Sequence, residues 1–286
     1  MEVSQWINGI SHLGIPVTNI DKAVAFYVNK LGFRLIHRKT VMDTLGTALE
    51  AAFVQLGDLL IELYKPTGSE VQTAGRSGGT IDHYAIDAPD FETCADMGFA
   101  RGLMLHNSTK DGSVFYQHIG PKGVQGVNFT GPNREVIEFC HDCAKDYGRK
   151  MGLQGWSHLA LKVKDLNRSL EFYEKLGFHK CADGYLDTPE GRLVIGFVQL
   201  KGFQLEIIQV CPSQRNGLEK REAGPIDHFA LDVRDVRQAF YACRQSGFSM
   251  ATTVVKELSL FEHGIKYFII EGPDGERIEF NQKLVW

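Results

Sequence analysis

Alternating apolar and polar positions indicate a β-strand that occurs four times along the chain, each time with a histidine near its start. In the third copy, Leu159, Leu161 and Val163 share one face, whereas His158 and Lys162 lie on the other, because successive side chains of a strand point to opposite faces. The apolar face predicts burial under a helix, and small residues beside the histidine leave room for a ligand. The four histidines are His12, His83, His158 and His228.

A helix is predicted directly after each of these strands. Its start is marked by an aspartate such as Asp165, and its end by a Gly-Phe pair. Aspartate is favoured at helix N-caps, and glycine at the left-handed residue that closes a helix. In the first copy we expect Asp21 to cap a helix that runs to Leu31 and stops at Gly32.

Three further strands follow each helix, and one of them carries a glutamate between two large apolar residues, as in LLIEL at 59–63 and ERIEF at 276–280. The apolar pair must face the core, which places the glutamate on the same type of face as the histidine. An unpaired buried carboxylate costs several kcal/mol, so its repetition indicates a cation. The four glutamates are Glu62, Glu138, Glu206 and Glu279.

The unit strand–helix–strand–strand–strand is therefore repeated four times, and the two halves resemble a domain duplicated twice. We expect an N-terminal domain at 1–144 with modules 1–66 and 81–141, and a C-terminal domain at 152–286 with modules 155–210 and 225–286. Linkers are predicted at 67–80, 142–154 and 211–224.

Four imidazoles and four carboxylates make two sets that suit two divalent metals, with positions left for water or substrate. A lone strand histidine is usually structural, and a lone glutamate there is usually exposed. The repetition of both at matched places favours metal ligation. Mixed nitrogen and oxygen ligands suit Zn, Ni, Co, Mn or Fe, and the sequence leaves the identity of the metal open.

Composition narrows the class of protein. At 286 residues the chain is long enough for two domains with real cores. A hydrophobic content of 43% and a net charge of −4 are typical of a soluble globular protein. The absence of a basic patch, of an apolar run near 18 residues and of a signal peptide argues against nucleic-acid and membrane partners. Six scattered cysteines fit a reducing cytosol, so we expect a cytoplasmic monomer or homodimer with a small-molecule substrate.

With these residues the chain resembles the vicinal oxygen chelate superfamily, which includes glyoxalase I, bleomycin-resistance proteins and extradiol dioxygenases. The resemblance rests on the His-Glu-His-Glu order and spans nearly the whole chain. It implies an α+β fold in which four βαβββ modules form two tandem domains with cupped mixed sheets. It also implies that pairs of modules enclose a metal, with the ligands His12, Glu62, His83, Glu138, His158, Glu206, His228 and Glu279.

The ligand set distinguishes the branches of this superfamily. A complete His/Glu/His/Glu set resembles bacterial glyoxalase I, whereas an extradiol dioxygenase would hold iron with His158, His228 and Glu279 and would lack Glu206. The arginines with which glyoxalase I binds glutathione are absent. Pro16, Gly79, Lys162 and Gly224 stand in their places.

The resemblance therefore implies a divalent-metal-dependent lyase, isomerase or epimerase that is not glutathione-dependent. Its substrate would be a small α-hydroxy- or keto-carbonyl compound that reacts through a metal-stabilised enediolate, with Glu138 and Glu279 as the catalytic bases. Lys162, Asp232 and Arg277 share the ligand face and are candidates for substrate binding. An extradiol-type Fe(II) dioxygenase and a small-molecule binding or resistance protein are the alternatives.

Two pairings of the modules are open at this stage. Each half could close on itself, or the halves could exchange modules. Exchange would join His12 and Glu62 to His228 and Glu279, and His83 and Glu138 to His158 and Glu206. Linkers of the observed length permit either arrangement.

Overall fold

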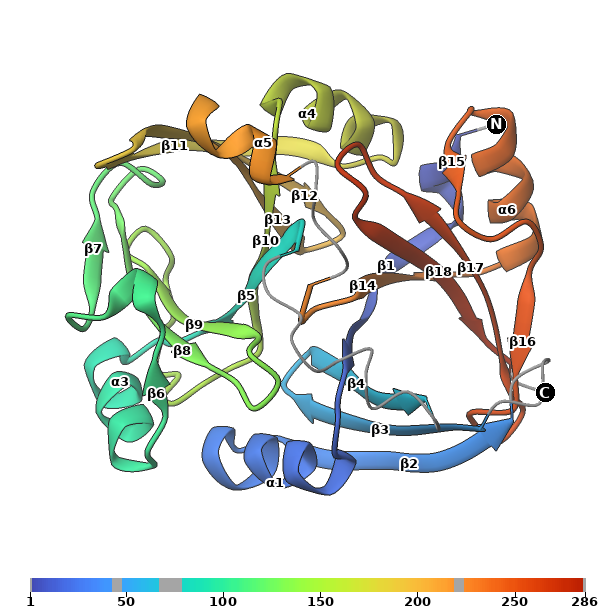
Figure 1. The fold of residues 1–286 in the computed structure, drawn as a ribbon, viewed down its shortest axis with the longest axis horizontal. Helices are drawn as coiled ribbons and strands as arrows, with labels where there is room; N and C mark the ends of the chain where they lie inside the picture. Colours follow the sequence, from blue (N-terminus) through green and yellow to red (C-terminus); the bar gives the residue numbers. More distant parts are fainter. Residues whose placement is uncertain (1, 43–47, 67–78, 219–223, 285–286) are drawn as a thin grey trace.

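Two nine-stranded mixed sheets lie side by side in the computed structural model of the protein (Figure 1). The structure describes residues 2–42, 48–66, 79–218 and 224–284. Within these ranges no helix is long and apolar enough to cross a membrane.

Each module begins with a long strand and a helix, followed by antiparallel strands, which confirms the predicted α+β fold. The first module contains β1 (Ile7–Pro16), α1 (Ile20–Leu31), β2 (Arg34–Met42), β3 (Ala48–Leu56) and β4 (Leu59–Pro66). The second contains β5 (Ile81–Asp87), α3 (Phe91–Ala100), β6 (Met104–Leu105), β7 (Val114–Tyr116), β8 (Val124–Thr130) and β9 (Val136–Asp142). The third contains β10 (Trp156–Val163), α4 (Leu166–Lys175), β11 (His179–Thr188), β12 (Gly191–Leu200) and β13 (Phe203–Gln209). The fourth contains β14 (His228–Val233), α6 (Val236–Gln245), β15 (Ser249–Met250), β16 (Lys256–Leu258), β17 (Ile265–Glu271) and β18 (Arg277–Lys283).

The modules pair across the two halves of the chain. One sheet has the order β15-β17-β18-β14-β1-β4-β3-β2, with β16 also paired to β17. The other has the order β11-β12-β13-β10-β5-β9-β8-β6, with β7 also paired to β8. Within each sheet the two modules are connected by one antiparallel strand pair, β1 with β14 in the first sheet and β5 with β10 in the second. Of the two arrangements left open by the sequence, the exchange is the one observed. Each sheet takes one module from each sequence repeat.

The apolar strand faces are buried as their alternation predicts, with Leu13, Ile15, Leu159 and Leu161 all fully inaccessible to solvent. The helices cover the outer faces of the sheets, as Figure 1 shows. Residues from all four modules join one continuous apolar core. The opposite strand faces, which carry the histidines and glutamates, are thereby held together on a rigid framework.

Two details of local structure differ from the sequence-based expectation. Helix α1 is capped by Asn19, not by Asp21, and the Asn19 side chain accepts a hydrogen bond from the Lys22 amide. Asp21 lies in the first turn, where a negative charge interacts favourably with the helix dipole. Gly32 closes this helix with φ of 81°, as predicted. The expected linker 211–224 begins with short helical turns at Pro212–Gln214 and Arg215–Leu218. Most of the linker 67–80 lies outside the described residues.

Two buried tyrosine–glutamate hydrogen bonds connect the sheets. The Tyr27 hydroxyl of α1 donates to Glu135 in the turn before β9, and the Tyr173 hydroxyl of α4 donates to Glu276 in the turn before β18, both at 2.8 Å. In each pair the helix and the turn belong to modules whose strands lie in different sheets. Burial raises the pKa of Glu276 to about 7, although its hydrogen bonds favour the ionised form.

The raised pKa of Glu276 predicts a loss of stability as the pH rises from about 4.5 to about 7. The folded protein holds a proton that the unfolded chain releases, so the stabilisation is complete below the unfolded value and is lost above the folded one. The effect is on the order of 3 kcal/mol. Denaturant titrations across this pH range should show a smaller loss of stability in Glu276→Gln than in the wild type, and the part that remains is expected from Glu135, whose pKa is also raised by burial. The control Glu174→Gln, an exposed change on α4, should keep the wild-type slope. Equal slopes in Glu276→Gln and the wild type would contradict the prediction.

Candidate metal centres

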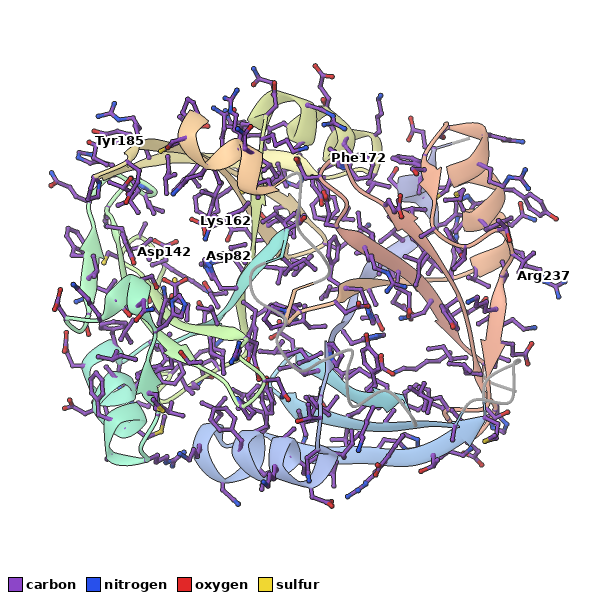
Figure 2. The ribbon with its side chains drawn as sticks, viewed as in Figure 1. Asp82, Asp142, Lys162, Phe172, Tyr185 and Arg237 are labelled. Carbon is purple, nitrogen blue, oxygen red and sulfur yellow. The ribbon has the colours of Figure 1, made fainter. Side chains whose placement is uncertain are left out.

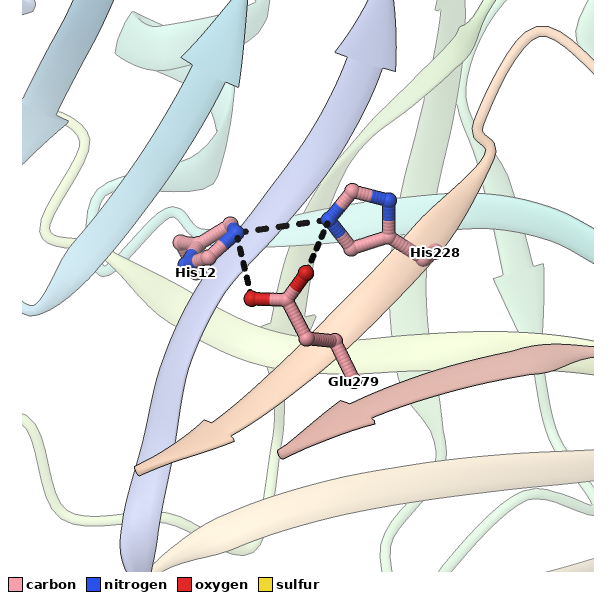
Figure 3. A group of neighbouring side chains, drawn as sticks. All are labelled: His12, His228 and Glu279. Atoms are coloured by element: carbon pink, nitrogen blue, oxygen red, sulfur yellow. Dashed lines mark hydrogen bonds and ion pairs between the residues drawn. The ribbon is translucent and has the colours of Figure 1, made fainter. Parts of the chain in front are cut away.

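Four buried side chains converge where β1, β4, β14 and β18 meet, and we call this group site 1: His12, Glu62, His228 and Glu279. The Nε2 atoms of the two histidines lie 3.3 Å apart. Each Nε2 atom also lies 3.3–3.9 Å from both carboxylates. Figure 3 shows His12, His228 and Glu279 pointing toward one common point.

A second group, site 2, has the same composition at the junction of β5, β9, β10 and β13: His83, Glu138, His158 and Glu206. Here the Nε2 atoms lie 3.2 Å apart. The four distances between a histidine Nε2 and a carboxylate oxygen are 3.1–3.5 Å. Site 2 is thus the more compact of the two.

The donor sets fit a divalent cation. Donors at the ~2.1 Å distance typical of zinc lie about 3.4 Å apart in a tetrahedral site, close to the spacings in both groups. Two neutral Nε2 atoms that face each other through their lone pairs repel unless a positive charge lies between them. Two carboxylates in a buried position need the same compensation.

Each histidine is oriented by the side chain of the residue before it. Nδ1 of the ring lies 3.0–3.3 Å from a hydroxyl or carboxylate oxygen, and Nε2 points to the cluster. Such partners fix the tautomer and angle of metal-binding histidines. The pairs are Ser11–His12, Asp82–His83, Ser157–His158 and Asp227–His228.

These four orienting residues are not among those predicted from the sequence. The signal was available, because a serine precedes the histidine in modules one and three and an aspartate precedes it in modules two and four. The two aspartates are paired with cations in turn. Lys162 lies 2.5 Å from Asp82 at site 2, where Figure 2 shows the two side chains together. At site 1, Arg277 donates to both oxygens of Asp227.

Without a metal ion, only protons on the histidine rings can compensate the negative charge of the carboxylates. The pKa values of the cluster residues reflect this. Burial alone would lower the pKa of His83, but hydrogen bonds to Asp82 and Glu138 raise it to about 9. Burial alone would raise the pKa of Glu138, but hydrogen bonds from His158 and His83 lower it to about 2. Glu138 is thus ionised at neutral pH, and the ring of His83 holds a proton. A metal ion that binds here must displace this proton.

The predicted substrate-binding residues are divided between the two sites. Lys162 lies at site 2 and Arg277 at site 1, so they do not act together. Asp232 accepts a hydrogen bond from Asn8 at an exposed position of the β1/β14 ladder, and none of its described contacts is with a cluster residue. Cys140 lines the cavity at site 2, and the Tyr64 ring lies 6.1 Å from the ring of His228 at site 1.

All four residues of site 2 line a cavity of about 240 Å³. Pockets for drug-sized ligands measure roughly 300–1,000 Å³, so this cavity suits a small molecule. Its apolar wall includes Phe197, which pairs with Ala182 on the neighbouring strand. At site 1 the corresponding pair is Phe53 and His37, and both rings pack against Phe261 at centroid distances of 5.1 and 4.9 Å. At site 1 the ring of His37, packed against Phe261, therefore stands where site 2 has the small side chain of Ala182.

Two glycines offer a selective test of the two sites. A Cβ atom at Gly14 would lie 2.0 Å from the His228 ring, and one at Gly126 would lie 2.4 Å from Glu138. Gly14→Ala should therefore displace a ligand of site 1, and Gly126→Ala a ligand of site 2. Each overpacked variant should lose about 1–3 kcal/mol of stability. Metal analysis should find about one equivalent fewer in each variant than in the wild type. Unchanged metal content in both would contradict the assignment of these ligands.

Comparison with known proteins gives the same fold. The family model described as "Glyoxalase/Bleomycin resistance protein/Dioxygenase superfamily" matches residues 9–146 and again 155–280. A lactoylglutathione lyase of Neisseria meningitidis serogroup A (strain Z2491) is 30% identical over 131 residues, which cover 44% of this chain and 88% of that protein. YwbC of Bacillus subtilis (strain 168), an uncharacterised protein, is 30% identical over 129 residues, or 44% of this chain and 95% of its own length.

A solved structure is similar over almost the whole chain. A glyoxalase I variant from Zea mays superposes with a TM-score of 0.66 at 18% sequence identity, covering 98% of this chain and 95% of the maize chain. At that identity the similarity shows the fold alone. The family model matches both sequence repeats, and the fold has the expected four modules. The chain therefore belongs to the Glyoxalase/Bleomycin resistance protein/Dioxygenase superfamily.

Proposed function

We propose that the protein is a divalent-metal-dependent glyoxalase-like enzyme, a lyase, isomerase or epimerase that acts on a small α-hydroxy- or keto-carbonyl compound. The observation that carries this proposal is the convergence of two imidazoles and two carboxylates at site 2, beside a cavity for a small molecule. A cation bound there would polarise a carbonyl oxygen and stabilise the enediolate left after loss of the adjacent proton.

Glu138 is the proposed base at site 2. Its carboxylate lies within 3.2 Å of both histidine Nε2 atoms, faces the cavity and is ionised at neutral pH because its pKa is lowered. A carboxylate in this position can take the proton next to a substrate carbonyl and return it to the neighbouring carbon. His83, His158 and Glu206 would hold the cation, which would fix the substrate relative to Glu138.

Glu279 is the equivalent residue at site 1, but its surroundings restrain it. Asn281 donates a hydrogen bond to its Oε1 atom at 3.0 Å and contacts His12 at 3.4 Å. At site 2 the residue two positions after the glutamate is Cys140, a weaker hydrogen-bond donor. We therefore assign turnover to site 2, and to site 1 a metal that stabilises the fold.

A glutathione adduct is not the proposed substrate. Several of the curated relatives are lactoylglutathione lyases, yet the positions of the glutathione-binding arginines hold Pro16, Gly79 and Gly224 here, and Lys162, the fourth, is paired with Asp82. A cavity of about 240 Å³ is also small for such a conjugate.

The test is a screen of α-hydroxyaldehydes, α-hydroxyketones and α-ketoaldehydes. The protein would be loaded with Zn, Ni, Co, Mn or Fe(II), and glutathione would be added or omitted. Isomerisation detected by proton exchange in NMR without glutathione is the expected result. A strict requirement for glutathione would contradict the proposal. So would oxygen uptake with a catechol, the signature of a dioxygenase.

A further inference from the structure

Site 2 has a hydroxyl group at a place where site 1 is apolar. Tyr116 of β7 pairs with Val124, and Leu258 of β16 pairs with Ile265. Each partner stands opposite the residue four positions after the glutamate proposed as a ligand on the next strand. Tyr116 and Leu258 are therefore equivalent, and Leu258 packs against the apolar cluster that includes Phe53.

The ring of Tyr116 lies beside the proposed base. A Cβ atom at Gly126 would lie 2.8 Å from Cε2 of Tyr116 and 2.4 Å from Oε1 of Glu138. The ring edge and the carboxylate thus flank the same glycine, whose lack of a side chain leaves room for both. The ring also packs against the apolar cluster that includes Ile119 and Phe197, which holds it in this position.

A molecule in the cavity can reach the Tyr116 hydroxyl. The residue is partly exposed and lines the cavity. Its hydroxyl oxygen has no hydrogen-bond partner among the described residues, yet it is not one of the side-chain atoms sealed from solvent. Burial raises the pKa of Tyr116, as do the negative charges of Glu138 and Glu206, so the hydroxyl keeps its proton at neutral pH. A bound molecule therefore meets a hydrogen-bond donor next to the base.

Most other polar side chains of the cavity wall have partners within the protein. The pairs are Lys162–Asp82, Ser157–His158, Cys140–His158, Asn128–Ser108, Gln204–Cys181 and Asp142 with the Ala144 amide. His106 is engaged through Nδ1 alone, by Ser108. Burial lowers the pKa of His106, and the charges that act on it are those of Asp82, Lys162 and His83. This ring therefore belongs to the Asp82 end of the cavity, whereas Tyr116 adjoins the base.

We infer that the Tyr116 hydroxyl donates a hydrogen bond to the substrate oxygen that becomes negatively charged when Glu138 removes the neighbouring proton. In this step the C–H bond breaks, its proton goes to the Glu138 carboxylate, and its electron pair moves toward the carbonyl oxygen. A donor aimed at an oxygen that gains charge stabilises the enediolate more than the substrate. The inference rests on the proposed function of site 2 and adds a second catalytic residue to it.

The kinetic test is Tyr116→Phe, which keeps the ring and its packing and removes only the hydroxyl. On a substrate found in the screen, kcat should fall by about 10²-fold, the loss typical of one such donor. KM should change little, because the contact strengthens only as the charge develops.

A binding measurement tests the same contact without turnover. The anion of acetohydroxamate, a small chelator, imitates an enediolate. Calorimetric titration of the Zn-loaded protein should show about tenfold weaker binding of acetohydroxamate in Tyr116→Phe than in the wild type, the value of one well-placed hydrogen bond.

Two variants serve as controls. Tyr185→Phe removes the same atom from a ring that stacks on His118 rather than lining the cavity. Leu258→Met is a volume-conserving change at the equivalent place of site 1. Both should keep the wild-type kcat and affinity. A wild-type kcat or undiminished acetohydroxamate binding in Tyr116→Phe would overturn the inference while the proposed function stands. Failure of the metal-loaded wild type to turn over any substrate of the screen and to bind acetohydroxamate would overturn both.

Discussion

Replacement of Glu138 by glutamine is expected to lower kcat by a factor of about 10²–10⁴, the usual contribution of a general base. Glutamine keeps the size of the side chain and an oxygen for the metal, but it cannot take a proton. The lowered pKa of Glu138 keeps the wild-type carboxylate ionised at neutral pH. Steady-state kinetics on a substrate found in the screen would measure the loss.

The matched control is Glu279→Gln at site 1. Because the assigned turnover lies at site 2, this change should lower kcat by less than tenfold, although it should weaken metal binding at site 1. Metal analysis of both variants separates loss of the base from loss of the ion. If Glu138→Gln retained its metal and full turnover, the assignment of Glu138 as the base would be wrong.

Removal of metal is expected to have the second large effect. A metal present at 1,000 times its dissociation constant stabilises the folded state by about 4 kcal/mol per site. Chelation should therefore abolish turnover and lower the free energy of unfolding by this amount for each site. Chemical denaturation with and without a chelator, followed by restoration of Zn²⁺, would measure the change. Equal stability and activity in the two states would contradict the metal assignment.

The pH dependence of the metal-free protein follows from His83. Its pKa is raised to about 9 by Asp82 and Glu138. Its protonation therefore contributes stability that is complete below pH ~6.5 and is lost as the pH rises through 9. The metal-free protein should become less stable over this range. The affinity for metal should rise over the same range, because fewer protons remain to be displaced.

Much of the fold could be predicted because the four modules repeat the same pattern. The two-residue period placed Leu159 and Leu161 in the core and His158 on the opposite face, and the structure confirms this burial. The pairing of modules could not be predicted, because linkers of this length permit both closures. It depends on strand-to-strand contacts between β1 and β14 and between β5 and β10.

The candidate site could be predicted from the sequence only in part, because only its repeated residues can be recognised by comparing the modules. The residues proposed as ligands recur in every module, so repetition revealed them. Lys162 and Arg277 appeared to belong together because both lie in the second half of the chain, but exchange of modules separates them.

Metal titration of the purified, chelator-treated protein tests the central claim most directly. Calorimetry with Zn²⁺ should give two ions per chain, and the double variant His83→Ala/His158→Ala should bind one. Protein that binds no metal, or a double variant that still binds two ions, would show that these histidines do not form the proposed centres.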